Sequence, residues 1–173
     1  GNEFKRVSAD VTVNEMFVRN VIGPTDFTPV VKPLSDNITM AHQMALAVLF
    51  ESGMPMMGDY SATYKNTTIY SFYKSIPSLK QQTVFLGGQP DFYYCAAVQT
   101  EKYWFVGAIN SSFEDNVTID FSFLDEGSYK AEIFTDADEA GKKVNKETIT
   151  ITKNDVKTFK LFAKGGLVIR LSK

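Results

Sequence analysis

The stretch "NVTIDFSF", residues 116–123, decides the fold class of the second half of the chain. Its apolar residues Val117, Ile119, Phe121 and Phe123 alternate with polar residues, so one face of the segment is apolar and the other polar. A period of two is typical of an antiparallel strand that buries one face. The stretch therefore predicts an antiparallel sheet, and the neighbouring sequence repeats its pattern.

Further short runs of apolar and β-branched residues follow one another from Pro77 to the last residue. Turn sequences such as "DEGS" and "AKGG" separate these runs at short intervals. Several short strands spaced in this way indicate an antiparallel sandwich or barrel. The expected strands are 92–99, 103–110, 116–123, 128–135, 147–152, 157–163 and 166–171.

Two helices are expected before Pro77. The segment "ITMAHQMALAVLFE", residues 38–51, places its apolar residues at helical spacing, and Asn37 or Thr39 can serve as its N-cap. The second helix is expected within residues 66–75, where apolar and aromatic residues again share one face.

The segment "FVRNVIGPTDFTP", residues 17–29, predicts a strand over 17–22 that is buried on both faces. Gly23 and Pro24 end this strand, and the following loop bears Asp26. One strand and two helices cannot close a core, because the strand would keep unpaired edges. They suit the last unit of a larger α/β barrel, in which catalytic groups lie on the loops after the strands.

The expected fold class is therefore an α+β fragment with two parts. Residues 1–76 are expected to be the last strand and helices of a (β/α)8 barrel, and residues 77–173 an antiparallel all-β C-terminal sandwich. The boundary is expected in the stretch 76–90, which contains two prolines and two glycines.

Composition excludes several function classes. A net charge of −2 and a pI near 5.5 give no electrostatic basis for binding nucleic acid or an anionic membrane surface. The apolar runs are too short for a membrane-spanning helix. A single cysteine, Cys95, excludes an internal disulfide and a cysteine-based metal cluster. With one histidine and one cysteine, carboxylates are the only plausible acid–base groups.

The segments "GNEF", "FVRNVIGPTDFTP", "AHQMALAVLFESG", "FYKSIPS", "YWFVGAIN" and "YKAEIFTDADEA" together resemble the C-terminal end of glycoside hydrolase family 97. The resemblance implies α-glucosidase or α-galactosidase activity. It also implies an N-terminal β-supersandwich, a catalytic (β/α)8 barrel and a C-terminal β-sandwich associated with oligomerisation. Glu3 matches the general acid of the family, which lies close to a calcium ion.

Glycoside hydrolysis needs two carboxyl groups on opposite sides of the scissile bond, and one of them needs a raised pKa. By the resemblance, the second carboxylate and most calcium ligands come from barrel strands that precede this chain. The chain alone is therefore expected to be inactive and to bind no calcium tightly, although the intact enzyme should bind calcium. The parent enzyme is expected to act on oligosaccharides, in the periplasm or outside the cell. The choice between glucoside and galactoside, and between inversion and retention, stays open.

A second function class is an independent β-sandwich that binds carbohydrate or another partner. The helices expected over 38–75 argue against it, because a free-standing sandwich does not need them. A homo-oligomer, most simply a twofold dimer, is expected because unpaired barrel elements would expose apolar surface.

Each candidate site residue also has a structural interpretation. Glu3 can be a solvated acid, and Asp26 can cap a turn instead of binding substrate. Arg19 can pair with a carboxylate at the barrel mouth and bind substrate, or simply extend its charge to solvent from a strand. His42 is expected to pack or cap at the start of a helix. Trp104 and Cys95 are expected in the core, with an unreactive thiol.

Overall fold

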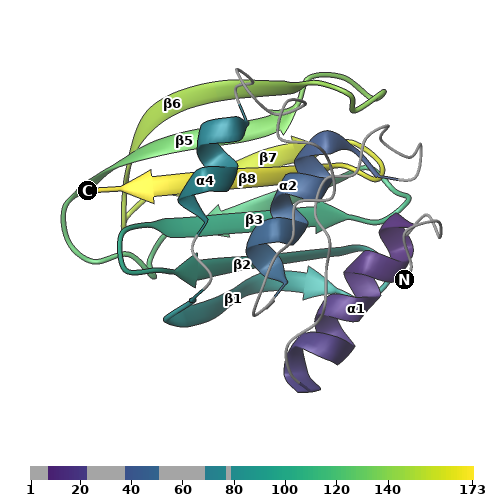
Figure 1. Cartoon of the computed structure of the whole chain (residues 1–173), viewed down its shortest axis with the longest axis horizontal. Coiled ribbons are helices and arrows are strands. Elements are labelled where there is room, and N and C mark those ends of the chain that lie inside the picture. The colour runs from purple at the N-terminus through teal and green to yellow at the C-terminus, as the bar shows by residue number, and fades with distance from the viewer. Residues whose placement is uncertain (1–7, 23–37, 51–68, 77–78) are drawn as a thin grey trace.

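The computed structural model describes residues 8–22, 38–50, 69–76 and 79–173, and the side chains of residues 19–22 are not described. In these residues three helices precede a series of strands that pair antiparallel (Figure 1). The prediction of a mainly antiparallel β-protein with a few helices is confirmed.

The first helix, α1 (Ala9–Ile22), replaces the strand that the sequence predicted over residues 17–22, so that prediction was wrong. The reason lies upstream of the segment considered. Ala9, Thr12, Val13 and Met16 recur at helical spacing, and all four are buried. Ser8 lies just before the helix, and its hydroxyl accepts a 3.4 Å hydrogen bond from the Val11 N–H.

The two other helices lie where the sequence placed them. Helix α2 (Met40–Leu49) is buried almost throughout, and the Thr39 hydroxyl caps it by accepting a 3.1 Å hydrogen bond from the His42 N–H. Helix α4 (Tyr70–Ser75) is short and directs Phe72 and Tyr73 inward. Thr39 is thus the N-cap of the two candidates, while Asn37 lies outside the described residues.

The strands form a six-stranded sheet in the order β1-β2-β3-β8-β5-β6 and a two-stranded sheet of β4 and β7. The strand pairings in the described residues are antiparallel, and the C-terminal strand β8 lies within the larger sheet between β3 and β5. The strands are β1 (Gln82–Gln89), β2 (Tyr93–Gln99), β3 (Trp104–Asn110), β4 (Asp115–Asp120), β5 (Ser128–Asp136), β6 (Val144–Thr152), β7 (Val156–Leu161) and β8 (Gly166–Ser172).

Seven of these strands match the predicted runs to within a few residues, whereas β1 was missed. It lies inside the stretch 76–90 that the sequence analysis treated as a boundary. Gly87 and Gly88 explain the error, because glycines in a short segment usually indicate a loop. In the structure Gly87 has a φ of 154°, and the pairing of β1 with β2 shifts between Phe85 and Gly87 as at a β-bulge.

The larger sheet is covered on both faces, which gives three layers (Figure 1). The helices pack on one face, where Phe72 of α4 contacts the rings of Phe105 and Phe134. The β4–β7 sheet packs on the other face through apolar side chains that include Ile119 and Leu161. Trp104 and Cys95 belong to this second core, as expected.

The division of the chain into residues 1–76 and 77–173 stays a prediction. What the structure shows is that α1, α2 and α4 share one apolar core with β2, β3, β5 and β8. Within the part of the chain that the structure describes, no helix is long and apolar enough to cross a membrane.

Candidate functional site

Of the three residues proposed from the sequence as a site, only Arg19 lies within the described residues. Glu3 and Asp26 lie outside the described residues. Arg19 lies in α1 and not in a strand, so its placement on a strand was wrong. In the described ranges, no three His, Cys, Asp or Glu side chains gather as a metal site would require.

A buried polar cluster joins the helices to the sheet at the first turn of α2. Asp136, at the end of β5, accepts hydrogen bonds from the Thr39 hydroxyl at 2.7 Å, the Ala41 N–H at 3.0 Å and the Gly166 N–H at 3.1 Å. Burial raises the pKa of the Asp136 carboxyl to about 6, although these three donors act to lower it. The cluster fixes α2 on the sheet, because the carboxylate satisfies N–H groups from both elements.

His42 extends this cluster toward α1. Its side chain is fully buried, with Nδ1 3.1 Å from the Gly165 carbonyl oxygen and Nε2 2.8 Å from the Thr12 hydroxyl. Burial lowers the pKa of His42 to about 4, so the ring is neutral near pH 7. A neutral ring that donates from Nδ1 accepts at Nε2, so the Thr12 hydroxyl, which lies 2.8 Å from both Nε2 and the Ala9 carbonyl oxygen, has one proton for two acceptors. His42 is therefore a packing residue of the helix layer, which confirms its structural interpretation.

A second polar group lies on the helix-covered face of the sheet, across three adjacent strands. Glu132 of β5 accepts from Arg170 Nε of β8 at 2.8 Å and also from Arg170 Nη2, and Lys146 Nζ of β6 lies 2.6 Å from its other oxygen. Burial opposes ionisation of Glu132, but the hydrogen bonds from Lys146 and Arg170 outweigh it and hold the pKa of that carboxyl below its usual value. Two cations thus share one carboxylate.

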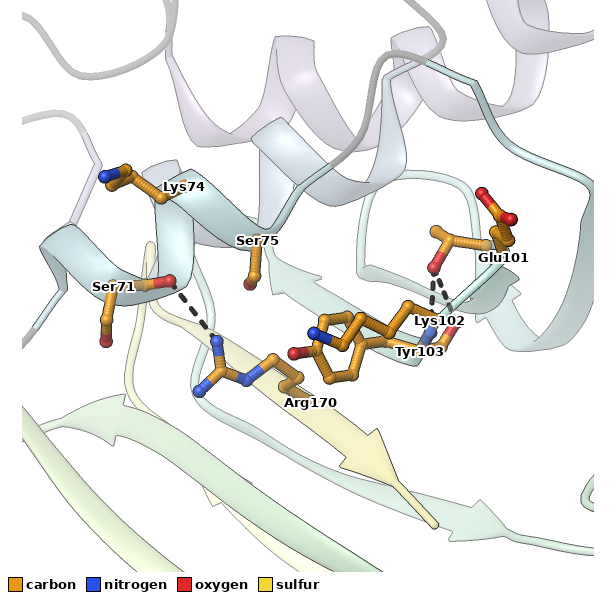
Figure 2. A pocket seen from close by; sticks show the side chains of 8 residues that line it. Ser71, Lys74, Ser75, Glu101, Lys102, Tyr103 and Arg170 are labelled. Carbon is orange, nitrogen blue, oxygen red and sulfur yellow. Dashed lines mark hydrogen bonds between the residues drawn. The ribbon is translucent and has the colours of Figure 1, made fainter.

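Arg170 also forms the floor of a pocket of about 380 Å³ between α4 and the turn that joins β2 to β3 (Figure 2). Its Nη1 donates to the Ser71 carbonyl oxygen at 3.3 Å, and its guanidinium lies 5.4 Å from the Tyr103 ring centroid. The pocket is lined by Ser71, Lys74, Ser75, Thr100, Glu101, Lys102, Tyr103 and Arg170. Another pocket, of about 290 Å³, lies beside Asp136.

The β2–β3 turn that forms one wall of this pocket is held closed by its own hydrogen bonds. The Thr100 hydroxyl donates to the Tyr103 carbonyl oxygen at 2.8 Å and accepts from the Tyr103 N–H at 3.0 Å. The Thr100 N–H bonds to the same carbonyl oxygen at 2.9 Å. The side chains that the turn presents to the pocket are therefore fixed at their base.

Exposed apolar side chains gather at the opposite end of the helix-covered face, around α1. Phe85 of β1 is 55% exposed and meets Phe17 of α1, while Phe92 and Phe113 stack with their centroids 6.0 Å apart. The loops that bear Phe92 and Phe113 are fixed by α1. Asn14 exchanges hydrogen bonds with Asp91, and the Asp10 carboxylate accepts from the N–H and hydroxyl of Ser112.

The sequence analysis missed Glu132, Asp136 and Arg170. The sequence does contain a signal for two of them, because Glu132 in "AEIF" and Arg170 in "LVIRL" are charged residues within otherwise apolar runs. Such charges are rarely buried without a partner. Cys95, in contrast, was interpreted correctly. It is buried, and burial raises the pKa of its thiol to about 12, so it is unreactive.

Comparison with known proteins gives a consistent result. Residues 80–172 match the family model of the glycosyl-hydrolase 97 C-terminal, oligomerisation domain. The chain is 28% identical to a retaining alpha-galactosidase from Bacteroides thetaiotaomicron over 90% of its own length and 26% of that protein. A glycoside hydrolase family 97 enzyme from Pseudoalteromonas sp. strain K8, solved in complex with acarbose, has a similar fold. The TM-score is 0.86 at 25% identity, over 95% of this chain and 28% of that one.

A beta-arabinopyranosidase shares the fold, with a TM-score of 0.77 at 19% identity over 94% of this chain and 28% of its own. The chain thus spans about a quarter of the length of the proteins that it matches. The family model covers just over half of the chain, and the matched residues 80–172 include strands β1 to β8. The chain therefore belongs to glycoside hydrolase family 97, of which it is a C-terminal portion that contains the oligomerisation domain.

Proposed function

We propose that this chain is the C-terminal part of an enzyme that hydrolyses α-galactosidic or α-glucosidic bonds in oligosaccharides. The observation that supports this most directly is the match of residues 80–172 to the family's C-terminal domain. The likeness to a retaining alpha-galactosidase over most of the chain supports the same conclusion. It favours a galactoside as substrate and a retaining mechanism, which needs a carboxylate nucleophile in addition to the acid.

The chain by itself is proposed to be inactive. It spans about a quarter of its relatives, whereas a (β/α)8 barrel typically takes about 250 residues. Helices α2 and α4 would come from the end of that barrel, and Glu3 would be the general acid of the complete site. Arg19 and Asp26 would lie near the bound sugar. Calcium would bind only in the complete enzyme, which would work in the periplasm or outside the cell.

Hydrolysis of 4-nitrophenyl α-galactoside and α-glucoside tests this proposal. We expect no turnover by residues 1–173 alone and turnover by the complete protein. In the complete protein Glu3→Gln should abolish turnover, while Glu126→Gln, a matched change at an exposed turn, should leave it unchanged. Turnover by the isolated chain that Glu3→Gln abolishes would overturn the proposal, and so would full activity of the complete Glu3→Gln variant.

We also propose that the domain joins copies of the chain, most simply as a twofold dimer. The family description and the exposed apolar side chains around α1 support this. Light scattering at micromolar concentration should give twice the 19.3 kDa mass of one chain. Phe113→Ser should shift the protein toward the monomer, whereas Val156→Ser, at an equally exposed position on β7, should not. A wild-type protein that stays monomeric contradicts this proposal.

A further inference from the structure

We propose that the pocket between α4 and the β2–β3 turn binds an acidic sugar unit, with its carboxylate held by Lys102 and Arg170. The anion specificity rests on the structure of the pocket, and the choice of a sugar rests on the proposed function. No role is otherwise assigned to this pocket, which lies apart from the exposed apolar side chains around α1.

The charge of the pocket is opposite to that of the chain. The whole chain has a net charge of −2, yet three cationic side chains line the pocket beside one carboxylate, Glu101. Figure 2 shows that the Glu101 carboxylate and the Lys74 ammonium are both directed away from Lys102 and Arg170. Glu132, which lies behind Arg170, is already shared with Lys146. The described residues therefore leave an excess of positive charge at this point of the surface.

Two of the cations are held against the same aromatic ring. The Lys102 ammonium lies 5.3 Å and the Arg170 guanidinium 5.4 Å from the Tyr103 ring centroid. The ring attracts each cation but does not neutralise it. The guanidinium has five N–H donors, and its hydrogen bonds to Glu132 and Ser71 use three of them. A carboxylate placed between the two cations would receive charge-assisted hydrogen bonds from both.

The rest of the lining favours a ligand with hydroxyl groups over a simple anion. The Ser75 hydroxyl uses its proton in a 2.6 Å bond to the Phe72 carbonyl oxygen, so toward a ligand it acts as an acceptor. The Thr100 hydroxyl likewise gives its proton to the Tyr103 carbonyl oxygen. A sugar hydroxyl can donate to the Ser75 oxygen, whereas the Thr100 oxygen is buried and already accepts from the Tyr103 N–H. The volume of about 380 Å³ lies near the lower end of the roughly 300–1,000 Å³ of small-ligand sites, which suits one sugar unit.

Calorimetric titration of residues 1–173 with galacturonate, galactose and phosphate tests the inference without requiring any turnover. We expect galacturonate to bind roughly tenfold more tightly than galactose, the factor that two exposed ion pairs supply together, and added salt to weaken its binding. Phosphate should bind more weakly than galacturonate, because it offers fewer hydroxyl donors. Backbone amide chemical shifts should change most at Ser75, Lys102 and Tyr103.

Two double variants make the test specific. Lys74→Gln with Lys102→Gln removes one of the two proposed ion pairs and should weaken galacturonate binding roughly threefold. Lys142→Gln with Lys143→Gln removes the same charge from an exposed loop and should leave binding unchanged. All four positions are exposed, so both variants should fold.

Three results would overturn the inference. Equal binding of galactose and galacturonate would exclude an anion site, and phosphate binding as tight as that of galacturonate would exclude a sugar site. If galacturonate does not bind and the Lys74/Lys102 variant loses self-association in light scattering, the pocket is a contact between copies. Each result leaves the hydrolysis test of the proposed function unaffected, so failure of one is distinguishable from failure of the other.

Discussion

The two faces of the six-stranded sheet are covered in different ways. The face toward β4 and β7 is packed mainly with apolar side chains that alternate along the strands. The face toward the helices combines an aromatic cluster around Phe72 with the buried polar groups Asp136 and His42. Apolar packing holds two surfaces together without fixing their relative position, whereas buried hydrogen bonds are satisfied in only one position. The helix layer is therefore positioned mainly by its polar contacts.

The largest losses of stability are expected when one buried phenylalanine is truncated in each of the two cores. Phe72→Ala and Phe121→Ala should each lower the free energy of unfolding by about 3–5 kcal/mol, because both side chains are fully buried. Hydrogen exchange should then distinguish them. Phe72→Ala should increase exchange in α2 and α4 while β4 and β7 stay protected, and Phe121→Ala should expose both sheets. Equal loss of protection in both variants would mean that the two faces unfold as one unit.

The next largest loss of stability is expected for substitutions of glycines at the contact between α2 and the sheet. A Cβ on Gly166 would lie 2.5 Å from the His42 Cα, a backbone atom that cannot move without the helix. A Cβ on Gly107 would instead meet the Leu49 side chain at 2.8 Å, which is able to rotate. Urea denaturation should show a loss of about 3 kcal/mol for Gly166→Ala and about 1 kcal/mol for Gly107→Ala. A smaller loss for Gly166→Ala than for Gly107→Ala would show that the backbone contact is not limiting.

Asp136 and His42, on the helix-covered face, should change the stability of the fold in opposite directions as the pH rises. Burial raises the pKa of Asp136 from 3.8 to about 6, so the folded state holds this proton more tightly and stability falls as the pH rises through that range. Nearby Asp138 acts in the same direction. The pKa of His42 is lowered from 6.5 to about 4, so stability rises as the pH rises from about 4 to 6.5.

The contributions of Asp136 and His42 to stability should nearly cancel in the wild-type protein between pH 4 and 6. In Asp136→Asn, stability should rise with pH because only the His42 contribution is left. In His42→Gln, stability should fall with pH because only the Asp136 contribution is left. Each slope should approach about 1.4 kcal/mol per pH unit at most. Urea denaturation at several pH values measures these slopes, independently of the offset that each substitution adds. Parallel pH profiles for the two variants would be inconsistent with the assignment.

The smallest effect concerns the cap of α2. Thr39→Val removes the hydroxyl that caps the helix and donates to Asp136, so it should cost about 1 kcal/mol. Thr118→Val removes a hydroxyl from the exposed Thr118–Thr158 pair on the outer sheet and should change stability by less than about 0.5 kcal/mol. Thermal melting of both variants gives the comparison, and equal changes would argue against a special role for the cap.

Part of the structure follows from local sequence alone. Apolar and polar residues alternate over 116–123, and residues 38–51 contain a helical apolar stripe with an N-cap. Both elements were therefore predicted to within a few residues of β4 (Asp115–Asp120) and α2 (Met40–Leu49). Local patterns suffice there because a strand or helix with one apolar face has one way to bury it. The resemblance to family 97 likewise lies in the order of short segments, and the family match confirms it.

The remainder depends on contacts between distant positions. The segment 17–22 has the composition of a strand, but the buried residues Ala9, Val13 and Met16 place it in a helix that packs on the sheet. Thr39 and Asp136 are 97 positions apart, and no local pattern indicates that they meet. The cations of the pocket come from α4, the β2–β3 turn and β8. The sequence by itself determined which segments bury apolar faces, while tertiary packing decided which polar groups those faces bring together, because only folding removes water from between them.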